Sequence, residues 1–166
     1  LIAQFLDPLI DHREDEYGGG LEDRSLFLRR VVDAVRAVIP DDMPLFVRLS
    51  ATDWAAGGWD LAQPVELSRV LQSHGVDLVD VSTGGLVPAV SVPVEPGYQV
   101  PFARKVRRGA DIPVTAVGLI TKPKQANKII RNHEADAVAI GRAALRDPYW
   151  PLRAAHKLGG DVKDAP

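Results

Sequence analysis

Residues 135–148 read Ala-Asp-Ala-Val-Ala-Ile-Gly-Arg-Ala-Ala-Leu-Arg-Asp-Pro, and this stretch decides the fold. An apolar run ends abruptly in Gly141-Arg142, and a helix-forming sequence follows at once. The pattern predicts a strand, a tight turn and the N-terminus of a helix. A glycine there lets backbone N–H groups approach a ligand closely, and the first helical turn offers unpaired donors. We therefore expect a phosphate site, with a simple turn as the alternative.

Three earlier apolar segments have the same character, and each is followed by a helical pattern. The strands are expected over 45–50, 76–82 and 112–118, and the last of them ends in Gly118. The helices are expected over 22–38, 64–74, about 101–108 and from 121, and a broken pair of helices is expected after 141. Residues 11–20 are expected to form a charged loop, and 159–166 a loose tail. No hairpin turn separates the strands, so they should be parallel and joined by right-handed crossovers.

Two α/β architectures fit this alternation: a doubly wound open sheet and part of a (β/α)8 barrel. The doubly wound fold favours a G-x-G-x-x-G fingerprint, which the sequence lacks. Glycines end both of the last two strands, as in the phosphate site that barrels build after strands seven and eight. We therefore predict the C-terminal half of a TIM barrel, with about four βα units carrying strands 5–8. Residues 1–166 should form this single unit, with no second domain.

The composition excludes several classes of protein. The net charge is −2, from 20 basic and 22 acidic residues, and the basic residues are scattered, which argues against nucleic-acid binding. The apolar opening Leu1 to Leu6 is too short to span a membrane, so a cytoplasmic location is the default expectation. No cysteine is available for disulfides or thiolate metal sites, and the four histidines lack ligand spacing, so no metal site is expected. Because the chain enters an apolar segment directly, we expect a piece of a longer polypeptide.

Arg48 is the first candidate functional residue, because it lies inside an apolar strand and needs an anionic or strongly accepting partner. Strand alternation places it on one face with Phe46 and Ser50. Either it pairs with an acid, such as Asp53 or Asp80, or it points toward a ligand over the top of the barrel.

Other polar residues near the strands carry weaker signals. Asp77 and Asp80 lie on opposite strand faces, so a catalytic carboxylate pair is not expected, and Asp77 is interpreted as a strand-entry residue. Residues 82–84 (Ser-Thr-Gly) end a strand on the same rim as Gly118 and Gly141. They can hold a polar ligand or simply form a turn.

Several segments, in order over essentially the whole chain, resemble the old yellow enzyme family of FMN-dependent oxidoreductases. They are Leu1-Ile2-Ala3-Gln4-Phe5-Leu6-Asp7-Pro8-Leu9, Arg13, Asp15-Glu16-Tyr17-Gly18-Gly19, Glu22-Asp23-Arg24, Phe46-Val47-Arg48-Leu49-Ser50-Ala51, Pro96-Gly97-Tyr98-Gln99-Val100-Pro101-Phe102-Ala103, Ala116-Val117-Gly118, Ile140-Gly141-Arg142 and Leu145-Arg146-Asp147-Pro148. The similarity is greatest to the bacterial ene-reductase and xenobiotic-reductase branch.

The resemblance implies a role for each candidate. Arg48 would lie by the N1/O2 edge of the flavin, where a fixed positive charge stabilises the anionic reduced ring. Gly118, Gly141 and Arg142 would hold the FMN phosphate. NADPH or NADH would supply hydride to the flavin, which would pass it to the electron-poor C=C bond of an enone-type substrate.

Three positions depart from the family's pattern: Asp23 stands in place of a usual Asn, and Asp7 and Gly20 in place of commoner serines. We interpret these as changes in loop capping. The family's substrate-binding and proton-donating residues are expected upstream of Leu1, so no catalytic residue is assigned in this segment and the chain alone should be inactive. It should form a homo-oligomer or associate with the missing half-barrel. The alternatives are a non-catalytic flavin- or phosphate-binding half-barrel and a dienoyl-CoA-type reductase, whose iron–sulfur domain would need cysteines.

Overall fold

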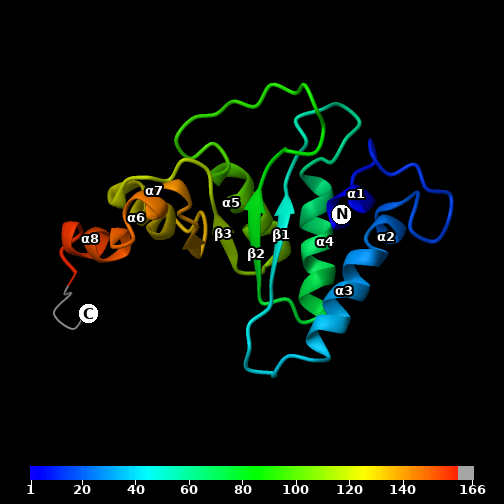
Figure 1. The fold of residues 1–166 in the computed structure, drawn as a ribbon, viewed down its shortest axis with the longest axis horizontal. Helices are drawn as coiled ribbons and strands as arrows, with labels where there is room; N and C mark the ends of the chain where they lie inside the picture. Colours follow the sequence, from blue (N-terminus) through cyan, green and yellow to red (C-terminus); the bar gives the residue numbers. More distant parts are fainter. Residues whose placement is uncertain (161–166) are drawn as a thin grey trace.

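A computed structural model describes residues 1–160, in which helices and strands alternate from residue 46 onward (Figure 1). The elements are α1 (Ile2–Leu6), α2 (Leu21–Arg24), α3 (Leu26–Arg36), β1 (Phe46–Ser50), α4 (Ala62–Ser73), β2 (Leu78–Ser82), α5 (Val100–Ala110), β3 (Val114–Ala116), α6 (Pro123–Arg131), β4 (Ala137–Val138), α7 (Arg142–Arg146) and α8 (Trp150–Lys157). The predicted tail extends beyond the described residues at 161–166.

The four strands form one parallel sheet in the order β1-β2-β3-β4, which is also their order in the chain. Arg48 pairs in register with Asp80, and Asp80 with Thr115, so these three residues form one row across the sheet. Sequential parallel strands with a helix after each one are the repeating unit of a βα barrel. The predicted α/β class and the four parallel strands are therefore confirmed.

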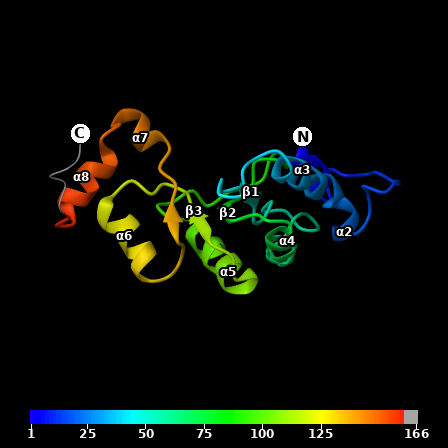
Figure 2. The ribbon, with the colours of Figure 1, turned by 90° about the horizontal axis from the view of Figure 1, so that it is seen from below.

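The two faces of the sheet differ in what covers them. Helices α4, α5 and α6 lie along one face, and the remaining helices gather at the two ends of the sheet (Figure 2). The apolar core lies under this helical layer, where Val79, Val81 and Leu71 are fully buried. The opposite face carries the row that begins at Arg48, and Phe46 on this face is 58% exposed. The polar row from Arg48 through Asp80 to Thr115 thus lies on the face that α4, α5 and α6 leave open.

The predicted helix over 22–38 is wrong in its bounds, because the structure has two helices, α2 and α3, that meet at Ser25. The Ser25 hydroxyl donates to the carbonyl oxygen of Glu22, a local bond that competes with continuous helix. Helix α3 ends at Arg36, and Val38, which extends the apolar spacing, is 80% exposed. Hydrophobic spacing alone therefore overestimated this helix.

Two further boundaries differ from expectation. The fourth strand is only Ala137–Val138, although backbone bonds from Asp136 N to Val114 O (2.9 Å) and from Ala139 N to Ala116 O (2.8 Å) extend its contact with β3. Helix α6 begins at Pro123 rather than at 121 and ends at Arg131. The opening helix α1 was not predicted, since five residues give too short a pattern to identify.

Candidate functional site

The loops after β3 and β4 enclose a cavity of about 250 Å³ at the carboxyl ends of the strands. Its wall includes all four residues singled out from the sequence, Arg48, Gly118, Gly141 and Arg142. Arg48 reaches it from β1, whereas the glycines follow β3 and β4. The parallel topology brings these segments together because the carboxyl ends of all strands lie on one rim.

Backbone geometry makes the glycine loops suitable for an anion. Gly118 has φ +114°, and a Cβ there would lie 2.9 Å from Gln99 Nε2 and 3.1 Å from a ring carbon of Tyr98. A Cβ at Gly141 would meet no atom within 4 Å, so this backbone faces open space. Among residues 1–160, none accepts a hydrogen bond from the N–H groups of Gly118, Gly141 or Arg142. These free donors, with the exposed Arg142 side chain, fit a phosphate group.

Arg48 both pairs with an acid and faces the cavity, so the two interpretations of this residue are compatible. Its Nη1 donates to Asp80 Oδ2 on the neighbouring strand. The Arg48 side chain is nevertheless 57% exposed, which leaves the other guanidinium donors available at the cavity wall. Of the two acids considered from the sequence, Asp80 is the partner and Asp53 is not.

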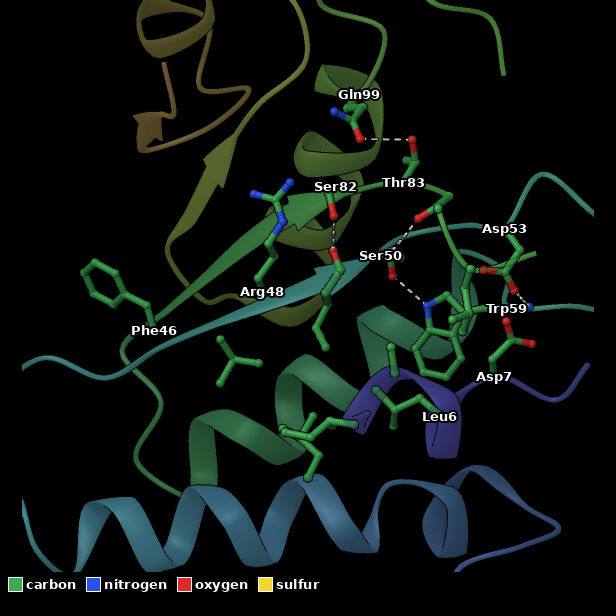
Figure 3. Close-up of a pocket in the computed structure, with 18 of the residues that line it drawn as sticks. Leu6, Asp7, Phe46, Arg48, Ser50, Asp53, Trp59, Ser82, Thr83 and Gln99 are labelled. Atoms are coloured by element: carbon green, nitrogen blue, oxygen red, sulfur yellow. Dashed lines mark hydrogen bonds between the residues drawn. The ribbon is translucent and has the colours of Figure 1, made fainter. Parts of the chain in front are cut away.

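A larger cavity of about 730 Å³ runs along β1 between the sheet and helices α1 and α3 (Figure 3). Arg48 and Gln99 line both cavities. The amide oxygen of Gln99 accepts a hydrogen bond from Thr83 Oγ1 (3.0 Å), which fixes the orientation of this side chain. Gln99 is 4% exposed, and it was not predicted as a separate site residue because it lies within a longer family motif, 96–103.

Two buried carboxyl groups, Asp7 and Asp53, face each other at the rim of the larger cavity, and each is 2% exposed (Figure 3). Asp53 Oδ2 accepts from Trp59 N (2.6 Å), and Asp7 Oδ1 accepts from Leu9 N (2.8 Å). The pKa of Asp53 is raised to about 6, first by burial and then by the neighbouring Asp7, against the lowering effect of the Trp59 N–H. At lower pH the protonated Asp53 can donate to Asp7, whose Oδ2 otherwise has no partner among the described residues.

The remaining sequence candidates lie in different places. Asp77 directly precedes β2 and binds Leu45 N (2.7 Å) and Arg36 (2.8 Å), which confirms its strand-entry role. These contacts, the Leu45 N–H first, lower the pKa of Asp77. Residues 82–84 line the larger cavity.

Within residues 1–160, no cluster of three or more potential ligands suits a metal ion, and no helix has the length and apolar character to cross a membrane.

Sequential parallel βα units, with glycine loops lining a cavity after two consecutive strands, place the chain in the βα-barrel class. The family model for the NADH:flavin oxidoreductase / NADH oxidase family matches residues 1–160. The chain belongs to this family, which confirms the resemblance to old yellow enzymes. FMN is accordingly its cofactor.

Two curated relatives illustrate the similarity. The NADPH dehydrogenase of Geobacillus thermodenitrificans is 52% identical over 163 residues, which cover 98% of this chain and 47% of that protein. The NADPH dehydrogenase of Bacillus pumilus is 51% identical with the same coverage. The chain therefore spans about half the length of the curated relatives it matches.

Solved structures agree with this assignment. A 2-naphthoyl-CoA reductase in complex with 2-naphthoyl-CoA superposes with a TM-score of 0.86 at 27% identity, over 95% of this chain and 24% of that one. Morphinone reductase in complex with tetrahydroNAD gives 0.72 at 26% identity, over 97% and 41%. An old yellow enzyme homologue from Zymomonas mobilis (0.73, 23% identity, 95% and 43%) supports the fold alone. The structure thus corresponds to about half of such a barrel.

Proposed function

We propose that this chain is the FMN-binding part of an NAD(P)H-dependent oxidoreductase that reduces the activated C=C bond of an α,β-unsaturated carbonyl compound. The observation that carries the proposal is the convergence of Arg48, Gly118, Gly141 and Arg142 on one cavity. Membership of the flavin oxidoreductase family supports the cofactor, and the similarity to NADPH dehydrogenases supports the reductant.

Each residue has a physical task in this proposal. The backbone N–H groups of Gly118 and Gly141 bind the phosphate, and the Arg142 guanidinium adds a charge-assisted contact. Arg48 holds a positive charge beside the flavin ring edge, where negative charge develops on reduction. When bound, FMN supplies the ring that accepts hydride from NAD(P)H and delivers it to the substrate.

In this proposal, the complete reaction also needs side chains that this chain does not contain. We infer that the substrate-binding and proton-donating side chains belong to the part of the relatives' length that this chain does not span. The chain by itself is then a cofactor-binding unit without turnover. The bare outer edge of β1 and the exposed Phe46 favour association with a partner, either a further half-barrel or a second subunit.

FMN titration followed by flavin fluorescence tests the site. Arg48→Ala and Gly141→Asp should each weaken binding at least tenfold, because one removes the cation and the other adds an anion beside the phosphate. Arg131→Ala, an exposed arginine on α6 away from the cavity, is the matched control and should bind like wild type. Equal affinity in all four proteins would rule out this assignment.

The activity is tested separately in the full-length protein that the gene encodes. Anaerobic mixing with NADPH or NADH should bleach the flavin absorbance, and addition of an enone such as 2-cyclohexenone should restore it. Bleaching without recovery would argue against enone reduction. FMN binding without bleaching by either nucleotide would instead favour the non-catalytic flavin-binding alternative.

A further inference from the structure

The ion pair between Arg48 and Asp80 is placed where it can control the charge of the proposed flavin site. The two residues are register partners on neighbouring parallel strands, and both side chains rise from the face that the outer helices leave open. Arg48 lies in the wall of the 250 Å³ cavity together with Gly118 and Arg142. Any ligand that reaches Arg48 therefore meets a cation that is already paired.

The two partners are buried to different extents. The Asp80 side chain is 20% exposed against 57% for Arg48, and the buried Asp80 Oδ1 has no hydrogen-bond partner among the described residues. The carboxylate thus depends on Arg48 to compensate its charge. Moving the guanidinium away would leave Asp80 partly buried and unpaired, which is costly. Asp80 consequently restrains Arg48 at the cavity wall.

Holding the two strands together does not require this pair. Backbone pairing already fixes the β1–β2 register from Phe46 to Ser50, and an ion pair with a half-exposed partner contributes only about 0–1 kcal/mol. The ion pair matters more for a ligand in the cavity than for the stability of the sheet. The negative charge of Asp80, in contact with Arg48, reduces the positive potential that the ligand experiences.

Building on the proposed function, we propose that Asp80 is a positioning residue that acts through Arg48. It holds the guanidinium at the cavity wall and offsets part of its charge, which limits how strongly the site favours the anionic reduced flavin over the oxidised one. The reduction potential of the bound flavin is then set by the pair rather than by Arg48 alone.

Asp80→Asn in the full-length holoprotein separates the two effects, since Asn still accepts a hydrogen bond from Arg48 but carries no charge. We expect reduced FMN to gain about tenfold in affinity relative to oxidised FMN, a rise of ~30 mV in the two-electron midpoint potential. Asp80→Glu, which keeps the charge, should remain close to wild type. Should Asp80→Asn not fold, Asp80→Ser removes the same charge and should give the same rise.

Asp77→Asn is the matched control, because Asp77 also pairs with an arginine beside β2 but lies away from the cavity. Its midpoint potential should equal that of wild type. An unchanged or lowered potential in Asp80→Asn, with FMN still bound, would overturn this inference alone. A wild-type protein that binds no FMN would overturn the proposed function and this inference together.

Discussion

The buried pair Asp7 and Asp53 makes the stability of the protein depend on pH in an unusual direction. The pKa of Asp53 is raised from 3.8 to about 6, so the folded state holds a proton that the unfolded state has released. Such a group stabilises the fold fully below about pH 4 and loses this contribution as the pH rises through about 6. The difference corresponds to about 3 kcal/mol of unfolding free energy.

Asp53→Asn is the direct test, because Asn resembles the protonated acid. Its oxygen can still accept from Trp59 N, and its amide can donate to Asp7. We expect the variant to be about 2–3 kcal/mol more stable than wild type at pH 8, with the advantage disappearing near pH 4. Equilibrium urea unfolding of the full-length protein at pH 4, 6 and 8 measures this difference.

The charge of the neighbouring Arg24 must be considered in the same experiment. Arg24 is 6% exposed and donates to the Leu6 carbonyl; burial lowers its pKa, and the charges of Asp11 and Asp7 oppose this effect. Asp42→Asn, an exposed site, should follow the wild-type pH dependence. Our interpretation of the pair is refuted if Asp53→Asn is less stable than wild type at pH 8, or if its advantage is the same at pH 4.

Three further substitutions test the fold and the cavity. Gly118→Ala should lower the free energy of unfolding by more than ~1 kcal/mol, measured by heat or urea, because φ at this residue is +114°. It should also weaken FMN binding, since the new Cβ would crowd the cavity wall. A variant as stable as wild type would contradict the backbone conformation assigned to Gly118. Gly141→Ala should leave stability nearly unchanged in the same unfolding experiment, since the space beside it is open, and a large loss would show that the loop is packed differently. Leu71→Ala, at a fully buried position under the sheet, should lower the free energy of unfolding by about 2–5 kcal/mol, and a loss below ~1 kcal/mol would place this side chain outside the core.

The gross architecture could be predicted because its signals are local. Apolar runs located the four strands, and glycine after β3 and β4 indicated the cavity, since parallel topology alone brings those two loops together. The Asp7 substitution was interpreted as a capping change, and its carboxylate does accept from Leu9 N (2.8 Å). The local signals therefore located the strands, whereas the bounds of the helix predicted over 22–38 were wrong.

Features that depend on contacts between distant segments could not be predicted. Strand alternation placed Arg48 on a face, but choosing Asp80 over Asp53 as its partner requires the β1–β2 register. The meeting of Asp7 with Asp53 requires the docking of α1 against the loop after β1, and α1 itself gave no periodic signal. Which charged residues pair with each other at the site is thus decided by tertiary packing.

The identity of strand order and chain order has a consequence for how the protein is made. Each strand of the β1-β2-β3-β4 sheet pairs only with strands adjacent in sequence, so no strand waits for a partner synthesised much later. Each pairing still joins segments that are separated by a whole helix, as in Phe46 with Leu78 and Val79 with Val114, so a loop must close before each parallel pair forms. As the ribosome extends the chain, each new βα unit can add to the edge left by the previous one. The two glycine loops that line the smaller cavity would then be the last parts of the described sheet to assemble.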